Sequence, residues 1–202
     1  MKNNFSQRKQ SILSKEDKSS RGKWDEKIVK LCDKINSFEE YYTTSSCSGR
    51  VVIMIDQDKK ESDLFLKVWH DLISLSQLRE ELKEIDKDSV KFKQKQDQRS
   101  SICPNLVKFK QEPCILHIDC RTIDDAKRLL DKARLAGWKK SGIISLGERI
   151  IVELNGTDKL EFPIMKSGKI LVGEDFLEVI VEKSNDNLKK SWSKIGKLKN
   201  LF

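Results

Sequence analysis

Apolar residues recur at two different periods along the chain, and the alternation between these periods predicts both helices and strands. Helical spacing predicts amphipathic helices that begin near Trp24, Leu75, Ile123 and Phe176. Continuous apolar or β-branched runs predict strands at residues 51–55, 64–70, 114–120, 143–146, 149–154, 160–164 and 169–172. Because hairpins occur beside crossover helices, we expect an α+β fold with a mixed, largely antiparallel sheet and packed helices.

Helix ends are marked by capping residues. Ser74 is followed three residues later by Gln77, and Thr122 by Asp125, so both pairs match the capping-box pattern. Gly137 stands where the helix that begins at Ile123 is expected to end.

Two segments lack a periodic pattern. Residues 86–105 are polar and rich in Lys and Gln, and we expect a surface excursion there. Residues 41–50 have no hydrophobic periodicity, which predicts a loop. The pentapeptide Val-Lys-Phe-Lys-Gln occurs at 90–94 and again at 107–111, so either copy can supply the strand before Pro113.

We expect a single domain over residues 1–202 with a basic helical tail at 183–202. A pseudo-repeat of residues 20–85 and 107–155 stays an open alternative.

Composition narrows the class of protein. The 202 residues are 37% hydrophobic and 36% charged, and 40 basic residues against 32 acidic ones give a net charge of +8. This excess favours a polyanionic partner. No apolar run approaches the roughly 18 residues of a membrane span, and the first ten residues lack the apolar core of a signal peptide. We therefore expect a cytoplasmic protein that does not enter the membrane.

Metal and common nucleotide sites are not indicated. The five cysteines include no C-x-x-C pair, and the two histidines offer few further ligands, so no metal is expected. No G-x-G-x-x-G follows a predicted strand, and there is no Walker loop. A Rossmann fold is therefore excluded.

The segment Thr43–Arg50 is the most unusual part of the sequence. Its hydroxyls, glycine and arginine, placed before a buried strand, can present N–H donors, O–H donors and one cation to a phosphate or carboxylate. The alternative is a Ser/Thr-rich turn whose hydroxyls satisfy nearby backbone groups.

His117 lies inside an apolar strand. Two-residue alternation places it on one face with Ile115 and Asp119, and places Cys120 on the other face, which excludes a shared metal. Asp119 is a candidate to orient the imidazole. The alternative is a core histidine with satisfied hydrogen bonds. The same two interpretations, a functional histidine or a core histidine, apply to His70, which lies beside Trp69.

Basic residues gather at both ends of the chain. Residues 1–27 hold eight basic and four acidic residues, and residues 183–202 hold six lysines and one aspartate. Such segments can bind a phosphate backbone with salt-dependent affinity. The alternative is ordinary solvated lysine.

A series of ordered motifs resembles one known family. They are Asp17-Lys18-Ser19, Trp24-Asp25, Tyr42-Thr43-Thr44-Ser45-Ser46-Cys47-Ser48-Gly49-Arg50, Trp69-His70, Glu112-Pro113-Cys114-Ile115-Leu116-His117 and Gly137-Trp138-Lys139-Lys140-Ser141-Gly142-Ile143. Together they are similar to the wybutosine-synthesis tRNA N-methyltransferase family over roughly Phe5 to Asn187, and the short chain looks like its stand-alone archaeal form.

The resemblance implies an enzyme with a non-Rossmann α+β fold. It would transfer a methyl group from S-adenosylmethionine to N4 of the tricyclic wyosine-type base at position 37 of phenylalanine tRNA. An RNA-binding adaptor without catalysis is the alternative, and it would bind tRNA but not S-adenosylmethionine. A structural or protein-interaction module would bind neither.

Roles for individual residues follow from this resemblance as hypotheses. His117 or His70 is the expected base, with Asp119 orienting it. The expected anion or cofactor contacts are Ser45, Ser46, Ser48, Gly49, Arg50, Ser141 and Gly142. The expected tRNA contacts are Lys18, Lys139, Lys140 and the aromatic rings of Trp69 and Trp138, although both tryptophans are equally compatible with a core position.

Overall fold

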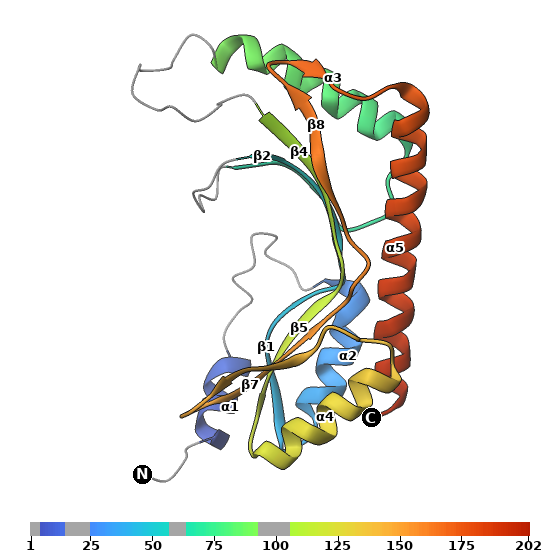
Figure 1. Cartoon of the computed structure of the whole chain (residues 1–202). Coiled ribbons are helices and arrows are strands. Elements are labelled where there is room, and N and C mark those ends of the chain that lie inside the picture. Colours follow the sequence, from blue (N-terminus) through green and yellow to red (C-terminus); the bar gives the residue numbers. More distant parts are fainter. Residues whose placement is uncertain (1–4, 15–24, 57–63, 93–105) are drawn as a thin grey trace. The chain divides into compact units, whose positions relative to one another are not determined.

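The computed structural model describes residues 5–14, 25–56, 64–92 and 106–202 (Figure 1). These residues form two compact units built from interleaved segments. Unit 1 combines segments 1–49, 113–158 and 189–202, and unit 2 combines segments 50–112 and 159–188.

Unit 1 contains a four-stranded antiparallel sheet in the order β1-β5-β7-β6. Its strands are β1 (Tyr41–Cys47), β5 (Ile115–Cys120), β7 (Ile150–Asn155) and β6 (Gly142–Leu146). Its helices are α1 (Phe5–Leu13), α2 (Glu26–Asn36), α4 (Ile123–Leu135) and the C-terminal part of α5 (Glu174–Asn200).

One face of the unit 1 sheet forms the core with α2 and α4 (Figure 1). Leu116 and Ile118 of β5 are completely buried there against apolar residues of both helices. We call the opposite face, which carries His117, the open face. Helix α1 reaches it at one end, where the Phe5 ring packs 5.1 Å from the Tyr42 ring.

The helix caps of unit 1 follow the sequence signals. Asp25 caps α2 by accepting a hydrogen bond from the Lys27 backbone N–H. Thr122 and Asp125 form the expected capping box at the start of α4. Gly137, with φ of +88°, follows the last turn of α4 in the left-handed conformation that favours glycine.

Unit 2 contains a five-stranded antiparallel sheet in the order β3-β2-β4-β8-β9. Its strands are β3 (Phe65–Trp69), β2 (Arg50–Ile55), β4 (Leu106–Glu112), β8 (Leu160–Lys166) and β9 (Lys169–Ile170). Its helices are α3 (Leu75–Phe92) and the N-terminal part of α5.

Helices α3 and α5 meet one face of the unit 2 sheet. Lys67 of β3 forms an ion pair with Glu81 of α3, at 2.7 Å. Asn187 of α5 donates a hydrogen bond to the buried Gln111 side chain of β4, at 2.8 Å. The other face carries charged side chains, among them Lys108, which pairs with both Asp56 and Glu161.

The α+β prediction is confirmed, and every strand pairing of the described residues is antiparallel, so the sheets are not mixed. The predicted strands all occur. The loop predicted at residues 41–50 is wrong, because residues 41–47 form β1 and pair along β5. Three buried side chains at its start, Tyr41, Tyr42 and Thr43, stabilise that strand despite its hydroxyl-rich end.

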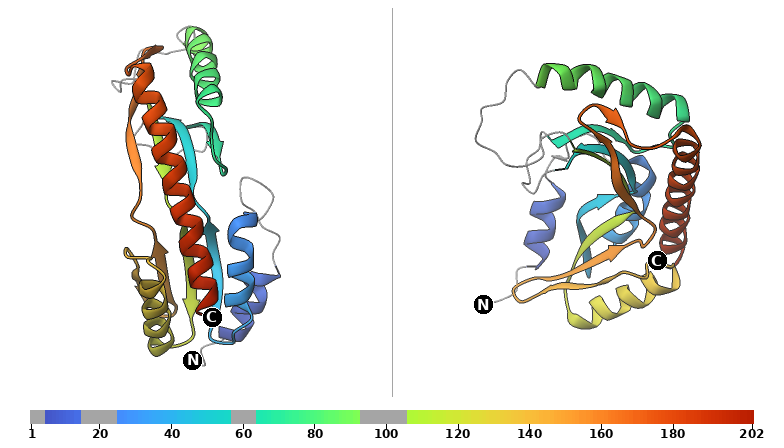
Figure 2. Two further views of the ribbon diagram at one scale, coloured as in Figure 1. Left: turned by 90° about the vertical axis from the view of Figure 1, so that its right-hand side faces the viewer. Right: turned by 45° about the horizontal axis from the view of Figure 1, so that its top comes forward.

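Two helical features differ from the expectation. Helix α1 was not predicted, and α3 continues to Phe92, into the segment expected to be a surface excursion. The copy of the repeated pentapeptide at 107–111 therefore supplies the strand, as part of β4. Figure 2 shows α5 as one uninterrupted helix. Among the described residues, none of the helices is long and apolar enough to span a bilayer.

Candidate functional site

A row of polar side chains crosses the open face of unit 1. The strand register sets Ser45 of β1 opposite His117 of β5, and His117 opposite Glu153 of β7. The Ser45 Oγ lies 2.9 Å from His117 Nδ1, and His117 Nε2 lies 2.9 Å from a Glu153 carboxylate oxygen. Both nitrogens of the imidazole are therefore engaged by neighbours on the same face.

The side chains of this row are hydrogen-bonded to one another and are also accessible to solvent. The side chains of His117 and Glu153 are 28% and 31% exposed, and Ser45 is exposed. The hydrogen bond from His117 holds the pKa of Glu153 below its usual value of 4.5, so Glu153 is an ionised acceptor near neutral pH. At the end of the row, Gly142 of β6 lies opposite Glu153, and a Cβ at Gly142 would meet no atom within 4 Å.

Asp119 does not orient His117, which corrects the prediction. It is completely buried, and one carboxylate oxygen accepts hydrogen bonds from Tyr42 Oη at 2.7 Å and Arg149 Nε at 2.5 Å. The expected face was right, because Asp119 and His117 are two residues apart on β5. Glu153, on the neighbouring strand, makes the contact instead.

The hydroxyls of β1 are divided between the two faces of the sheet. Thr43 faces α2 and accepts a hydrogen bond from Asn36 at 3.0 Å. Ser46 also faces α2, where its hydroxyl interacts with the Cys32 thiol. Because adjacent strand residues point in opposite directions, Ser45 and Ser46 cannot contact one ligand together. The expectation that they form a single anion site is therefore wrong.

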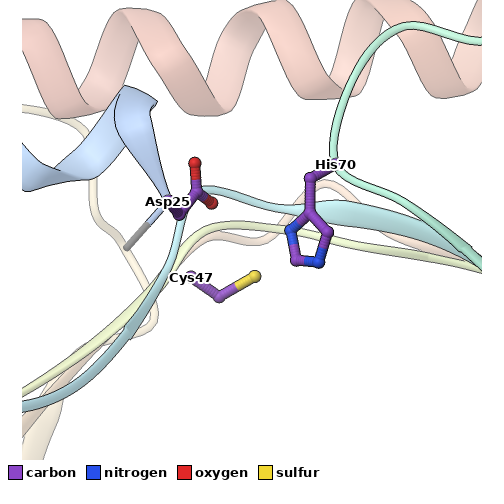
Figure 3. A group of neighbouring side chains, drawn as sticks. All are labelled: Asp25, Cys47 and His70. Carbon is purple, nitrogen blue, oxygen red and sulfur yellow. The ribbon is translucent and has the colours of Figure 1, made fainter. Parts of the chain in front are cut away.

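The end of β1 lies beside the start of α2. The Ser48 backbone N–H donates a hydrogen bond to the Asp25 carboxylate at 2.8 Å, and the Asp25 carboxylate and the Cys47 Sγ lie within 4.8 Å of each other (Figure 3). The Ser48 hydroxyl is completely buried and has no hydrogen-bond partner among the described residues. Gly49 then adopts a φ of +106°, which a side chain would strain.

Arg50 begins β2 in unit 2 and is already paired. Its Nε donates to a Glu112 carboxylate oxygen at 2.5 Å, and its guanidinium lies 5.2 Å from the Phe65 ring centre. Burial opposes ionisation of Glu112, but its ion pairs with Lys110 and Arg50 outweigh burial and lower its pKa. Arg50 is thus held in place by Glu112, and any anion would share it with that carboxylate.

The second candidate histidine, His70, directly follows β3 in unit 2 and is also labelled in Figure 3. Both His70 and the neighbouring Trp69 are half-buried. The Lys67 ammonium lies 5.7 Å from the centre of the Trp69 ring. Trp69 therefore keeps some accessible ring surface.

Trp138 cannot stack on a base, which corrects the prediction. It is completely buried in the unit 1 core, and its Nε1 donates to the Lys194 backbone carbonyl at 3.2 Å. The core alternative is the right one. Lys139 and Lys140, which follow it, are exposed as a phosphate contact requires. Lys18 lies outside the described residues.

Ser141 has a structural role in its surroundings. Its hydroxyl donates to the Trp138 carbonyl at 2.8 Å and accepts from the Asn155 N–H at 3.3 Å. These bonds connect the segment between α4 and β6 to β7. The Ser141 hydroxyl, for which the sequence predicts a ligand contact, is thus occupied by backbone groups.

Sequence reasoning missed Glu153 as a member of the site. The run at residues 149–154 was correctly interpreted as a strand, and alternation along it places Glu153 and Asn155 on one face. The polar residue in that apolar run was a signal. The sequence could not show that Glu153 pairs with His117, because the register between β5 and β7 depends on tertiary pairing.

Thiol reactivity provides a first test of this arrangement. Burial raises the pKa values of Cys32, Cys114 and Cys120 to about 12, whereas Cys47 is only half-buried. At pH 8 roughly one in 10⁴ molecules of such a buried thiol is ionised. We expect iodoacetamide to modify Cys47 well before those three.

Peptide mapping by mass spectrometry measures the rates separately and distinguishes Cys103, which lies outside the described residues. Denatured protein is the control, in which the three buried cysteines should react at the rate of Cys47. Equal rates in the folded protein would contradict the buried positions.

Comparison with known proteins adds an independent finding. Residues 7–202 match the model of the family described as Methyltransferase TYW3. A relative from Archaeoglobus fulgidus, named tRNA(Phe) 7-((3-amino-3-carboxypropyl)-4-demethylwyosine(37)-N(4))-methyltransferase, is 35% identical over 179 residues, which cover 87% of this chain and 81% of the relative. A relative from Pyrococcus horikoshii, with the same name and the number 1, is 33% identical and covers 95% of this chain and 90% of its own.

A solved structure agrees with the fold. The structure of the PH1069 protein from Pyrococcus horikoshii superposes with a TM-score of 0.80 at 33% identity, over 98% of this chain and 95% of that one. Sequence and fold match over nearly the whole length, and the chain therefore belongs to the Methyltransferase TYW3 family.

Proposed function

We propose that this protein transfers a methyl group from S-adenosylmethionine to N4 of 7-(3-amino-3-carboxypropyl)-4-demethylwyosine at position 37 of tRNA(Phe). The observation that carries the proposal is the 35% identity over 179 residues to the Archaeoglobus fulgidus protein, which is named for this reaction. The alternative of a non-catalytic RNA adaptor has no support from the two relatives described above, both of which are named as methyltransferases.

The residues around the end of β1 fit part of the methyl donor. S-adenosylmethionine carries a carboxylate and an ammonium group, and the buried Ser48 hydroxyl lacks a partner among the residues described in unit 1. An unsatisfied buried hydroxyl is costly, so a ligand group that bonds to it is favoured. Ser48 and Gly49 would hold the amino-acid part of the donor.

The chemistry asks little of the protein beyond alignment and proton removal. The donor supplies an activated methyl group on a sulfonium sulfur, which is displaced in line. Holding the acceptor nitrogen close to the line of attack contributes up to roughly 7–11 kcal/mol. The acceptor nitrogen also loses a proton, and a positioned base contributes about 10²–10⁴-fold to such a step. His117 is the proposed base, because it has a carboxylate partner and an accessible hydroxyl beside it.

Binding of tRNA is assigned to exposed lysines of unit 1. Four lysines of the C-terminal part of α5 are exposed, namely Lys189, Lys190, Lys197 and Lys199. Lys190 and Lys197 are seven residues apart and share one stripe of the helix. The lysines of that stripe would displace counterions from the phosphate backbone of the tRNA.

Changing Lys190 and Lys197 together to alanine is expected to flatten the dependence of tRNA affinity on salt. The logarithmic slope should fall by about one for each phosphate contact that is lost. Filter binding at several salt concentrations measures this slope. Lys166 and Lys169, exposed lysines of unit 2, provide a matched double-alanine control with the same loss of charge. An unchanged slope in the Lys190/Lys197 variant would mean that this stripe is only solvated.

The proposed reaction is tested by transfer of radiolabelled methyl groups from S-adenosylmethionine to tRNA from cells that lack this protein. Nucleoside analysis of the product should place the label on the wyosine-type base, and tRNA without that base should stay unlabelled. Tight binding of tRNA without any label would favour the adaptor instead.

A further inference from the structure

The hydrogen bonds of His117 define what its imidazole can do. An ionised carboxylate has no proton to donate, so the contact between Glu153 and His117 requires a proton on Nε2. In the neutral ring, Nδ1 is then an acceptor, and the Ser45 hydroxyl 2.9 Å away is its donor. The lone pair of the imidazole therefore points at Ser45 and not at solvent.

Ser45 is the member of the row that a substrate can reach from the open face. It is exposed, whereas each nitrogen of His117 is covered by a protein group. A substrate nitrogen that approaches this row thus meets the Ser45 oxygen before it meets the imidazole. Ser45 and the two residues after it pair with β5, and the register shifts between Thr43 and Ser45.

We propose that Glu153 is a positioning residue that holds His117 as the Nε2–H tautomer, so that His117 accepts the proton of the methylated nitrogen through the Ser45 hydroxyl. This inference rests on the proposed function and adds to it a positioning residue and a route for the proton. In this proposal Glu153 acts through His117 and not on the substrate itself.

The step is balanced as follows. The nitrogen of the base attacks the methyl carbon, and the bond between that carbon and the sulfonium sulfur breaks with its electron pair left on sulfur. The N–H proton passes to Ser45 Oγ as the Ser45 hydroxyl proton passes to His117 Nδ1. The products are a neutral thioether, the methylated base and an imidazolium that the Glu153 carboxylate stabilises. The imidazolium then returns its extra proton to solvent.

Other acids and bases of the described open face are placed differently. Asp119 lies two residues away on β5, and one of its carboxylate oxygens accepts hydrogen bonds from Tyr42 and Arg149 instead of contacting His117. The hydrogen bond from His117 lowers the pKa of Glu153 most; burial opposes this effect, and the hydrogen bond from Asn155 and the charge of Lys140 lower the pKa further. Asn155 donates a hydrogen bond to the second Glu153 oxygen at 3.4 Å. These contacts orient the carboxylate toward the imidazole and keep it ionised.

The test is the substitution Glu153→Gln, which keeps the shape of the side chain and removes its charge. An amide can either accept from Nε2–H or donate to an unprotonated Nε2, so the tautomer of His117 is no longer fixed. Glu148→Gln is the matched control, since Glu148 is exposed on the turn of the same β6–β7 hairpin. For all three proteins we would measure kcat, KM for tRNA, and the ¹⁵N chemical shifts of the His117 ring.

We expect Glu153→Gln to lower kcat by roughly 10²-fold with KM changed less than twofold, because the tautomer is no longer fixed and the imidazolium loses the carboxylate that stabilises it, while binding stays intact. The ¹⁵N shifts should show protonated Nε2 in the wild type and in Glu148→Gln, and a mixture of tautomers in Glu153→Gln. A kcat within twofold of the wild type, or an unchanged tautomer, would overturn the inference. A variant with lower kcat and an unchanged tautomer counts against it too.

The same experiment distinguishes failure of the proposed function from failure of this inference. In that case the wild type itself forms no methylated base, while the ¹⁵N shifts still report whether Glu153 sets the tautomer of His117. Ser45→Ala completes the test. It should reproduce the loss of kcat and leave the Nε2–H tautomer in place, and full activity of Ser45→Ala would exclude the route through the hydroxyl.

Discussion

Replacing His117 with alanine is expected to lower kcat for methyl transfer by roughly 10²–10⁴-fold, with the affinity for S-adenosylmethionine changed little. The variant removes the proton acceptor of the row and leaves the end of β1 untouched, where Ser48 and Gly49 are proposed to hold the donor. Single-turnover kinetics at saturating donor, together with calorimetric titration of the donor, separate the two effects.

His70→Ala is the matched control for His117→Ala, because both histidines are half-buried and both are candidates for the base. We expect the larger loss of kcat from His117→Ala. Unchanged turnover of His117→Ala, with a loss in His70→Ala, would move the base to His70 and reject the role assigned to the row on the open face.

The second large effect concerns stability. Trp138→Ala should lower the free energy of unfolding by about 3–5 kcal/mol, the range for removing a large buried aromatic side chain. Trp138 is completely buried among the core residues of unit 1 and donates a hydrogen bond to the Lys194 carbonyl. Chemical denaturation, with m-values compared between the variants, measures the change.

Trp138→Phe is the matched control, since it keeps an aromatic ring and should lose less stability than alanine. Trp69→Ala gives the contrast for tRNA binding, because Trp69 keeps accessible surface. If Trp138→Ala weakened tRNA binding and left the unfolding free energy unchanged, the tryptophan would be a stacking platform and its core position would be contradicted.

Much of the fold could be predicted because its elements are encoded locally. The apolar runs of β2 and β5, and the capping residues Thr122 and Asp125, carry their own signals. Strand β1 could not be predicted this way. Its hydroxyl-rich end has low apolar content, and its stability comes from pairing with β5, which is about 70 residues away in the chain. The extension of α3 to Phe92 was missed because the polar residues there show no apolar stripe.

The candidate site was predictable in part. Alternation along β5 correctly placed His117 and Asp119 on one face, yet Asp119 proved to be a buried partner of Arg149. Whether Asp119 or Glu153 contacts His117 depends on which side chains are neighbours across strands. The sequence of a single strand does not determine that register. The same limit applies to Ser45 and Ser46, whose separation became visible only when β1 was known to be a strand.

The interleaving of the two units has a consequence for how the protein is made. The core of unit 1 includes Ile195 and Leu198 near the end of α5, together with residues of α2 near the start of the chain. During synthesis α2 therefore cannot complete this core, and keeps its apolar face exposed, until α5 has left the ribosome. Folding that depends on such distant contacts is slow. We expect the nascent chain to need chaperone protection, and a chain shortened before Ile195 to aggregate rather than to form unit 1 alone.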